Sequence, residues 1–462
     1  MSGTRSGAFV FFGATGNLAA KKIFPALYHL ERQDQLGMPV IGVASRPWTV
    51  EQLRDYARES IHRTVKTVDK AVLERLLASI QYVSGRYDEP ATFAALAALI
   101  QPESRPLHYL AIPPDQFELV VGGLRNVGLH RDARVVVEKP FGRDLASARH
   151  LGAVLHDAFG EADIFRIDHF LGKEPIQNLM VFRFANTILE PVWNRHYISS
   201  VQITMAEAKG VDGRGPFYEG VGALRDVVQN HLLEILGLLA MEPPVADDAD
   251  AWRDEKRKVF RAIKALDPAS VVRGQYGGYR KEPGVAPESD VETFVALRLE
   301  IDSWRWAGVP FYIRAGKGLH ENITEAIIEF KAPPRLLFSD ADCTPPEPNR
   351  LHFRLGPDDA ITLRVQVKEP GDRMFTRPVD LSLNQTPDEE NGGPYERLLG
   401  DAMDGDARLF ARQDGVEEAW RIVQPVVDAP PAVHLYKQGS WGPKAAIDVW
   451  QGEGHWLAPE TH

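Results

Sequence analysis

The sequence contains a single cysteine, Cys343, among its 462 residues. One cysteine excludes an intrachain disulfide and a zinc site built from several cysteines, and low cysteine usage is typical of a reducing compartment. Cys343 stands in a proline-rich stretch, which predicts a surface loop and no functional role for the thiol.

The chain also lacks long apolar segments and an excess of basic residues. No run approaches the roughly 18 apolar residues that a membrane-spanning helix needs, and residues 1–8 lack the apolar core of a signal peptide. Lys and Arg number 53 against 64 Asp and Glu, a formal net charge of −11 that disfavours nucleic acid and anionic lipid as partners. We therefore expect a cytoplasmic protein that binds neither nucleic acid nor a membrane.

Short apolar runs alternate with helical patterns in the first part of the chain. The runs cover residues 9–12, 40–44, 107–112 and 134–137, and a helical pattern at 18–30 follows the first of them. Strands that alternate with helices are typical of β-α-β units around a parallel sheet. The pattern predicts an α/β, Rossmann-like dinucleotide-binding domain over residues 1–172.

The remainder of the chain has a different periodicity. Apolar and polar residues alternate at 201–205, 295–301 and 361–367, and a helical pattern covers 222–241. Such alternation indicates strands with one buried and one polar face, as in an antiparallel sheet. We expect a larger α+β domain over residues 173–462 with a mainly antiparallel sheet.

A glycine turn follows the first predicted strand and opens the first predicted helix. Glycines at such a turn let backbone N–H groups approach a pyrophosphate at the helix N-terminus. The spacing G-x-x-G-x-x-A differs from G-x-G-x-x-G, and an ordinary turn could share it, but its place after the first strand favours a dinucleotide site. The residues of this predicted site are Gly13, Ala14, Thr15, Gly16, Asn17 and Leu18.

The end of the second predicted strand bears on the choice of coenzyme. NAD sites commonly carry an acidic residue there to hold the ribose 2′-hydroxyl, but this chain has Ser45, Arg46 and Pro47. Arg46 can pair with a 2′-phosphate, which favours NADP over NAD. The alternative is that Arg46 is a solvated surface arginine.

Two histidines and four lysines are candidates for a catalytic base and for phosphate-binding residues. A dinucleotide oxidoreductase that acts on a sugar hydroxyl needs a base, and histidine suits that task near neutral pH. Among 14 histidines, His169 and His231 stand out by context, although His231 could also be a core histidine of a helix.

A sugar phosphate needs several fixed cations, because one exposed ion pair contributes only about 0–1 kcal/mol. Four lysines beside glycine or proline residues could supply them: Lys22, Lys139, Lys173 and Lys317.

Taken together, these motifs resemble the glucose-6-phosphate dehydrogenase family over nearly the whole chain. The most specific stretch is the nine residues at 166–174. The matching stretches are Gly13-Ala-Thr-Gly-Asn-Leu-Ala, Tyr109-Leu-Ala-Ile-Pro-Pro, Glu138-Lys-Pro-Phe-Gly, Arg166-Ile-Asp-His-Phe-Leu-Gly-Lys-Glu, Gln177-Asn-Leu-Met, Gly213-Arg-Gly, Arg225-Asp-Val-Val-Gln-Asn-His, Arg314-Ala-Gly-Lys and Gly439-Ser-Trp-Gly-Pro.

The resemblance implies an activity and residue roles. It implies oxidation of glucose 6-phosphate at C1 to 6-phosphogluconolactone, the first step of the oxidative pentose phosphate pathway, with hydride transfer to NADP or NAD and no metal. It implies that His231 is the base and that Asp168 orients it. Pro113 and Lys139 are implied at the coenzyme, and a homodimer or homotetramer is implied through the large sheet. The implied substrate-binding residues are His169, Lys173, Glu207, Asp226, Lys317, Lys139 and Lys22.

The chain departs from the family pattern in a few places. Phe170 replaces a tyrosine that usually touches the phosphate, so we expect weaker phosphate binding. Asn17 replaces an aspartate, and Ala20 replaces a lysine. Two other functions remain open: a related sugar oxidoreductase in which Lys139 is the main acid and base, and a sensor that binds NADP and sugar phosphate without turnover.

Overall fold

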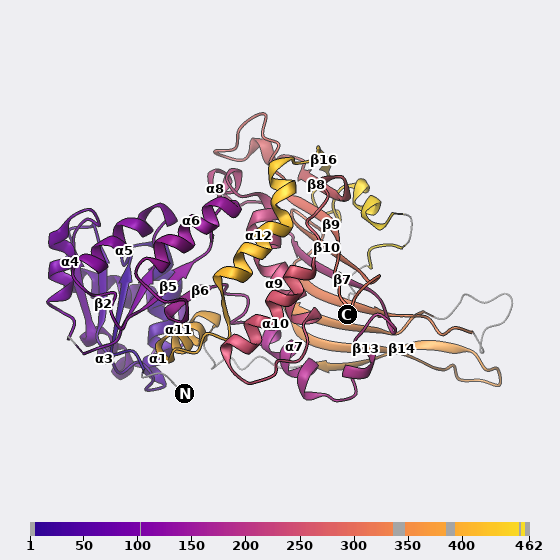
Figure 1. Cartoon of the computed structure of the whole chain (residues 1–462), viewed down its shortest axis with the longest axis horizontal. Coiled ribbons are helices and arrows are strands. Elements are labelled where there is room, and N and C mark those ends of the chain that lie inside the picture. Colours follow the sequence, from indigo (N-terminus) through magenta and orange to yellow (C-terminus); the bar gives the residue numbers. More distant parts are fainter. Residues whose placement is uncertain (1–4, 102, 336–346, 385–392, 452–453, 458–462) are drawn as a thin grey trace. The chain divides into compact units, whose positions relative to one another are not determined.

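The computed structural model describes residues 5–101, 103–335, 347–384, 393–451 and 454–457. The chain forms two compact units (Figure 1). The first comprises Met1–Lys173, Pro244–Arg253 and Glu389–Glu417, and the second comprises Glu174–Pro243, Asp254–Asp388 and Glu418–His462. Cys343 lies outside the described residues. Among the helices described, none has the length and apolarity to span a membrane.

The first unit is built on a seven-stranded sheet in the order β15-β6-β5-β4-β1-β2-β3. Only β15 runs antiparallel to its neighbour. The order 3-2-1-4-5-6 is that of a doubly wound dinucleotide-binding fold, and it reverses between β1 and β4. The α/β prediction is therefore confirmed. The strands are β1 (Ala8–Phe12), β2 (Val40–Ala44), β3 (Ile80–Ser84), β4 (Pro106–Leu110), β5 (Arg134–Glu138), β6 (Ile164–Ile167) and β15 (Phe410–Ala411).

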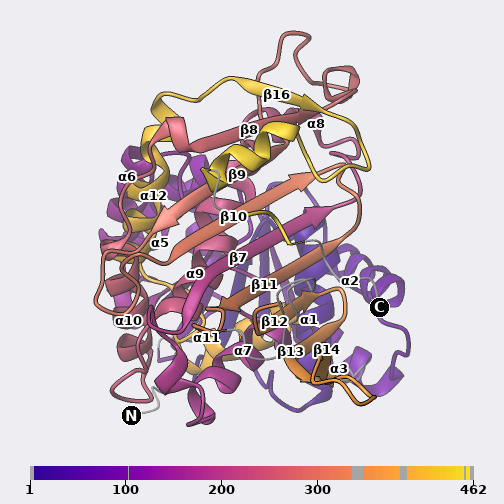
Figure 2. The ribbon, with the colours of Figure 1, turned by 90° about the vertical axis from the view of Figure 1, so that its right-hand side faces the viewer.

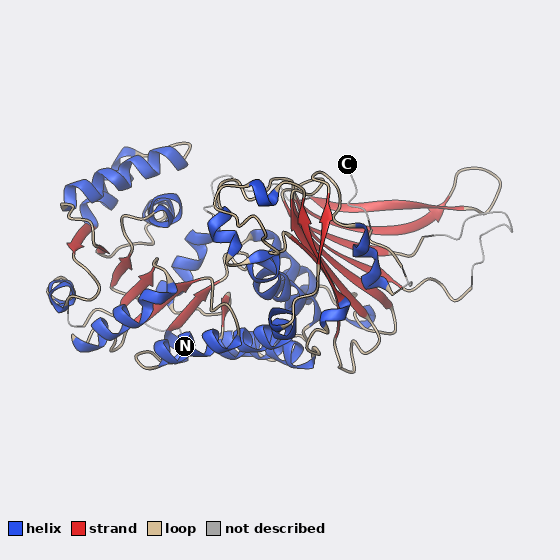
Figure 3. Cartoon of the chain, turned by 90° about the horizontal axis from the view of Figure 1, so that it is seen from above, coloured by secondary structure: helices blue, strands red, loops and turns tan. Residues whose placement is uncertain are grey.

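Helices cover both faces of this sheet (Figure 3). Successive side chains of a strand point to opposite faces, so Phe9 and Phe11 join one apolar core while Val10 and Phe12 join the other. Burial on both faces explains why the strands read as continuous apolar runs. The helices are η1 (a π-helix, Ala19–Ile23), α1 (Phe24–Arg32), α2 (Val50–Thr64), α3 (Lys70–Ser79), α4 (Pro90–Ala97), η2 (Pro114–Gln116), α5 (Phe117–Asn126), α6 (Leu145–His156), η3 (Glu161–Asp163) and α11 (Pro394–Asp404).

The second unit contains a nine-stranded sheet in the order β14-β13-β12-β11-β7-β10-β9-β8-β16 (Figure 2). Neighbours are antiparallel except for β10 with β7 and β16 with β8, which confirms the mainly antiparallel prediction. The strands are β7 (Ile198–Glu207), β8 (Val271–Tyr276), β9 (Phe294–Glu300), β10 (Pro310–Lys317), β11 (Ile323–Phe330), β12 (Arg350–Gly356), β13 (Asp359–Lys368), β14 (Thr376–Asn384) and β16 (Val433–Tyr436).

The helices of the second unit include the longest stretch of π-helix in the described chain. They are α7 (Glu174–Ala185), η4 (Glu190–Val192), α8 (Gly215–Glu219), η5 (a π-helix, Leu224–Leu232), α9 (Leu233–Ala240), η6 (Pro268–Ser270), η7 (Tyr279–Lys281) and η8 (Lys444–Trp450). Two helices have residues in both units: α10 (Ala249–Ala262) and α12 (Gln413–Asp428).

The expectation of one buried and one polar face is wrong for β7. Gln202 and Thr204 point to the expected polar face, yet they are only 3% and 2% exposed. The C-terminal segment covers them, because the Leu457 N–H donates to Gln202 Oε1 at 3.0 Å and Arg314 donates to both Thr204 Oγ1 and the Leu457 carbonyl. Conversely, Leu363 of β13 is 37% exposed, although its alternation predicts burial.

The return of residues 389–417 to the first unit depends on a few buried contacts. Phe410 of β15 is 0% exposed, and its ring meets that of Phe165 edge to face at 4.9 Å between centroids. Arg134 of β5 donates to the Met403 carbonyl at 2.6 Å and thereby holds the end of α11. A segment distant in sequence thus completes the core of the first unit.

We expect Phe410→Ala to lower the free energy of unfolding by about 3–5 kcal/mol, because it leaves a cavity against Phe165. Denaturant titration followed by circular dichroism would measure the loss. Val245→Ala is a suitable control, since Val245 is 91% exposed. A loss below about 1 kcal/mol for Phe410→Ala would contradict this role for β15.

Candidate active site

The glycine turn lies at the carboxyl end of β1, beside β4, where the strand order reverses. Gly13 has φ +84°, and a Cβ there would lie 2.3 Å from the Ala111 carbonyl oxygen, so only glycine fits. The Gly16 N–H donates to the Gly13 carbonyl at 2.9 Å and closes the turn before η1. Pro113, which is exposed, follows β4 at the same edge of the sheet. This place and this turn fit a dinucleotide pyrophosphate.

Two tyrosines that the sequence analysis missed form hydrogen bonds with the backbone of this turn. The Gly13 N–H donates to both the Val43 carbonyl and the Tyr87 hydroxyl, each at 2.9 Å. Burial raises the pKa of Tyr87 to about 12, so its hydroxyl stays protonated at neutral pH. The Tyr56 hydroxyl donates to the Gly16 carbonyl at 3.2 Å. Tyr56 and Tyr87 therefore fix the conformation of both glycines.

Arg46 lies two residues beyond the end of β2 and is exposed. Its guanidinium carbon is 5.2 Å from the centroid of the Trp48 ring. Its neighbours Ser45 and Pro47 carry no charge, so the end of this strand offers a cation where an NAD site would offer a carboxylate. The donor set fits a coenzyme with a 2′-phosphate.

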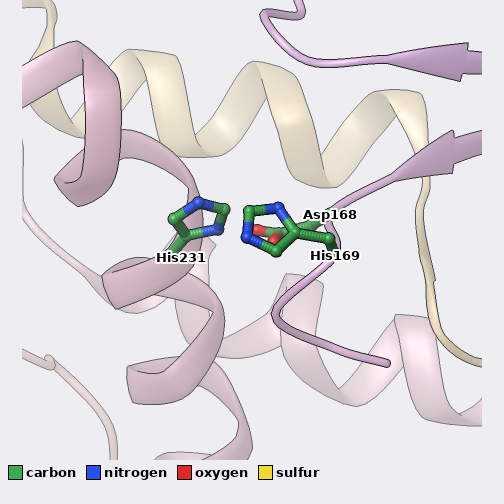
Figure 4. A group of neighbouring side chains, drawn as sticks. All are labelled: Asp168, His169 and His231. Carbon is green, nitrogen blue, oxygen red and sulfur yellow. The ribbon is translucent and has the colours of Figure 1, made fainter. Parts of the chain in front are cut away.

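The segment after β6 is a turn and not a continued strand (Figure 4). Asp168 is 2% exposed, and its Oδ1 accepts the Phe170 N–H at 2.9 Å. The Leu171 N–H donates to the Asp168 carbonyl at 3.0 Å, and the Lys173 N–H donates to the Phe170 carbonyl at 3.0 Å. The chain therefore folds back at Asp168, directly after the end of β6.

Basic side chains lie near this turn and near Tyr395 of α11. The His169 ring stacks on the Tyr395 ring at 6.3 Å and 15°, and Lys22 Nζ lies 5.8 Å from the Tyr395 centroid. Lys173 Nζ lies 3.5 Å from the centroid of Phe170. Desolvation lowers the pKa of Lys173, and the charge of Lys22 lowers it further, while Asp168 opposes the shift. Together with the basic side chains of Lys22 and His169, the partly desolvated Lys173 is suited to binding an anionic ligand.

Glu138, at the end of β5, is a further residue to which the sequence alone assigned no role of its own. The hydroxyls of Tyr109 and Tyr395 both donate to its carboxylate. Desolvation raises the pKa of Glu138 to about 7, although both tyrosines and the adjacent Lys139 favour the charged form. Glu138 thus fixes the hydroxyl of Tyr395, whose ring His169 contacts.

In the second unit, Glu207 and Lys317 end two neighbouring parallel strands, β7 and β10, and pair in register. Lys317 Nζ donates to Glu207 Oε1 at 2.7 Å and lies 5.5 Å from the centroid of the Tyr218 ring. The Tyr436 hydroxyl donates to the Lys317 carbonyl at 2.6 Å, which fixes the backbone there. The carboxyl ends of the two strands thereby place the Glu207 carboxylate and the Lys317 amino group side by side.

Asp226 and His231 lie on the π-helix η5, and Figure 4 shows His231 on this helix. His231 is 2% exposed. The first turn of η5 is anchored by Glu292, whose Oε1 accepts the Leu224 N–H at 3.1 Å and whose Oε2 accepts two bonds from Arg273 at 2.9 and 3.1 Å. Glu292 and Arg273 are 4% and 7% exposed. π-helices are rare and occur often at functional sites.

The predicted site residues are divided between the two units. Lys22, Lys139, Asp168, His169 and Lys173 belong to the first unit together with the glycine turn, Arg46 and Pro113, and Glu207, Asp226, His231 and Lys317 belong to the second.

Comparisons with known families and proteins agree with one another. The family model described as "Glucose-6-phosphate dehydrogenase, NAD binding domain" matches residues 10–178, and the model described as "Glucose-6-phosphate dehydrogenase, C-terminal domain" matches residues 180–457. The chain is 49% identical over 458 residues to glucose-6-phosphate 1-dehydrogenase 1 of Mycobacterium bovis, which covers 99% of this chain and 97% of that protein.

Solved structures show the same similarity. A crystal structure of glucose-6-phosphate 1-dehydrogenase from Mycobacterium avium matches with a TM-score of 0.91 and 48% identity, and covers 99% of this chain and 100% of that chain. A structure of a glucose-6-phosphate dehydrogenase in complex with its substrate glucose-6-phosphate matches with a TM-score of 0.92 and 34% identity, with the same coverage of both chains.

The raised pKa of Glu138 predicts a pH-dependent contribution to stability. The folded state favours the protonated carboxyl, so this contribution is full below about pH 4.5 and is lost as the pH rises through about 7. Glu138→Gln stays neutral throughout. We therefore expect the unfolding free energy of the wild type, relative to that of Glu138→Gln, to fall between about pH 4.5 and 7.

Denaturant titrations at several pH values would measure this difference. Glu118→Gln, on an exposed position of α5, is the matched control and should give no such trend. Parallel stability curves for the wild type and Glu138→Gln would show that Glu138 does not titrate in this range.

Proposed function

We propose that this chain, which belongs to the glucose-6-phosphate dehydrogenase family, oxidises glucose 6-phosphate at C1 to 6-phosphogluconolactone. This reaction is the first step of the oxidative pentose phosphate pathway. The observation that carries the proposal is the match of both family models in sequence order, at 49% identity to a curated relative over nearly the whole chain. A related structure that holds glucose-6-phosphate supports the same substrate.

His231 is the proposed base. A histidine can take the proton of the C1 hydroxyl near neutral pH, and His231 is buried on a helix whose start Glu292 and Arg273 hold. Asp168 is proposed to orient the imidazole and to stabilise its protonated form, as the carboxylate of a dyad does. The nicotinamide ring, when bound, accepts the hydride from C1.

The remaining polar residues are proposed to hold the sugar phosphate. His169, Lys173 and Lys317 supply the positive charge and hydrogen-bond donors for the phosphate, and Lys139 and Lys22 reach between the sugar and the coenzyme. Glu207 and Asp226 accept hydrogen bonds from sugar hydroxyls. Phe170 offers no hydroxyl to the phosphate, so we keep the prediction that this chain binds phosphate more weakly than relatives with tyrosine there.

The coenzyme is a nicotinamide dinucleotide, and NADP is the proposed form, with NAD as the second candidate. The turn Gly13–Leu18 would receive the pyrophosphate, with Pro113 and Lys139 nearby in the coenzyme site. Arg46 would pair with the 2′-phosphate, because the end of β2 carries no acid to hold a free 2′-hydroxyl. We propose that the enzyme works in the cytoplasm, in line with its single cysteine.

A self-association surface is proposed on the outer strands of the large sheet. Leu363 of β13 lies opposite Leu381 of β14, and Ile361 lies opposite Leu383, so these side chains share one face. Leu363, Leu381 and Leu383 are 37%, 55% and 61% exposed. An exposed apolar sheet face is typical of a protein interface. We propose that it joins two chains into a homodimer, or into the dimers of a homotetramer.

We expect His231→Asn to lower turnover by about 10²–10⁴-fold with glucose 6-phosphate, because the base is lost. Lys139→Ala should raise KM more than it lowers kcat, since Lys139 is proposed to bind and not to act as the base. Steady-state rates of both variants would separate the two mechanisms. Near-normal turnover of His231→Asn together with an inactive Lys139→Ala would assign the base to Lys139.

We expect the double variant Leu381→Lys, Leu383→Lys to have a smaller sedimenting mass than the wild type, because two charges would enter the proposed interface. Sedimentation velocity would measure it. Leu435→Lys is the control, since Leu435 is 72% exposed on β16 at the opposite edge of the sheet. An unchanged mass for the double variant would refute the proposed surface.

A further inference from the structure

Two aromatic residues connect Arg46 to the glycine turn. The Arg46 guanidinium lies over the ring of Trp48 at 5.2 Å. The Trp48 ring meets the Tyr56 ring edge to face, with 5.4 Å between centroids and 67° between planes. The Tyr56 hydroxyl in turn donates to the Gly16 carbonyl at 3.2 Å. A continuous series of contacts therefore runs from the exposed cation to the turn proposed for the pyrophosphate.

The backbone at Arg46 is fixed independently of its side chain. The Arg46 carbonyl accepts hydrogen bonds from the Trp48 N–H at 2.8 Å, the Tyr82 hydroxyl at 2.6 Å and the Ser84 hydroxyl at 2.9 Å. Tyr82 and Ser84 belong to β3, the strand next to β2. With the backbone held, the remaining freedom of Arg46 lies in its side chain, and the Trp48 ring restricts that freedom.

Trp48 and Tyr56 are themselves held by the rest of the unit. Both are partly buried against the apolar core that contains Phe9 and Phe11. The Tyr56 ring also meets Phe24 edge to face at 6.1 Å. Trp48 directly precedes Thr49, which caps α2 by accepting the Gln52 N–H. The indole is thus a firm support beneath an otherwise exposed arginine.

The neighbouring charges leave Arg46 suited to a phosphate. Arg86, which follows β3, is paired with Asp88 at 2.8 Å and lies 3.9 Å from Glu89. Arg46, by contrast, is in contact with an aromatic face, and a guanidinium can stack on a ring while it still donates to a phosphate in its own plane. An arginine that is already restricted loses less freedom when it binds.

We propose that Trp48 is a specificity-determining positioning residue, which holds Arg46 for the 2′-phosphate of the coenzyme, and that Tyr56 couples this support to the pyrophosphate turn. The inference rests on the proposed function only in that the coenzyme is a nicotinamide dinucleotide. Trp48 acts through Arg46 and so distinguishes NADP from NAD. Tyr56 acts through Gly16 and so affects both coenzymes alike.

The test is the binding of NADP and NAD to the full chain by isothermal titration calorimetry, without substrate. Arg46→Ala should lower the preference for NADP over NAD by at least about 10-fold, since a charge-assisted contact is lost. Trp48→Leu keeps an apolar side chain but loses the ring, and should lower the preference by about 2–5-fold. Trp48→Phe, which keeps an aromatic ring, should retain more of the preference for NADP over NAD than Trp48→Leu does.

The double variant Arg46→Ala, Trp48→Leu shows whether Trp48 acts through Arg46. Its preference should equal that of Arg46→Ala alone, because residues that act as a unit are not additive. Tyr56→Phe, which loses the bond to Gly16, should weaken NADP and NAD equally, by about 2–5-fold. Trp304→Leu is the control, since Trp304 lies in the second unit and is 91% exposed, and it should change neither affinity.

Several results would overturn the inference. Equal weakening of NADP and NAD by Trp48→Leu in a folded protein would assign Trp48 a structural role only. If Trp48→Leu lowers the preference for NADP over NAD as much in the Arg46→Ala background as in the wild type, Trp48 does not act through Arg46. A wild type that binds both coenzymes but never reduces them would refute the proposed function and leave this inference standing.

Discussion

The hydrogen bond from the Phe170 N–H to the buried carboxylate of Asp168 is the constraint on which the first half of the site depends. It ends β6 and turns the chain back within two residues. His169 then meets Tyr395, and Lys173 lies over Phe170. Burying a carboxylate is costly unless it accepts hydrogen bonds or serves a charged partner. Asp168 therefore has both a local structural task and, as we propose, a catalytic one.

In the second unit, a buried ion pair holds the helix that carries two of the proposed site residues. Arg273 pairs with Oε2 of Glu292, almost fully removed from water, and Oε1 of Glu292 accepts the Leu224 N–H at the start of η5. Breaking a buried ion pair by removing one partner lowers the free energy of unfolding far more than breaking a surface pair does. The helix that carries Asp226 and His231 is consequently well anchored, whereas Glu207 and Lys317 are aligned by the parallel register of β7 and β10.

Much of the fold could be predicted from the sequence, because β1, β2, β4 and β5 are buried on both faces and read as apolar runs. β3 and β6 lacked such a clear pattern, and β15 is only two residues long. The motif residues of the site were recognised because each motif is contiguous. Tyr395, Glu292 and Tyr56 were not, since each is brought to the site by long-range packing that no local pattern records.

We propose that this chain catalyses the oxidation of a sugar phosphate and does not merely bind it. The most direct measurement is the initial rate of coenzyme reduction, followed by absorbance, with glucose 6-phosphate or with glucose at equal concentration. We expect a rapid absorbance rise with glucose 6-phosphate and a much slower one with glucose, because glucose has no phosphate for Lys173 and Lys317 to bind. No rise with either NADP or NAD, in a folded protein that binds coenzyme and sugar phosphate, would contradict it.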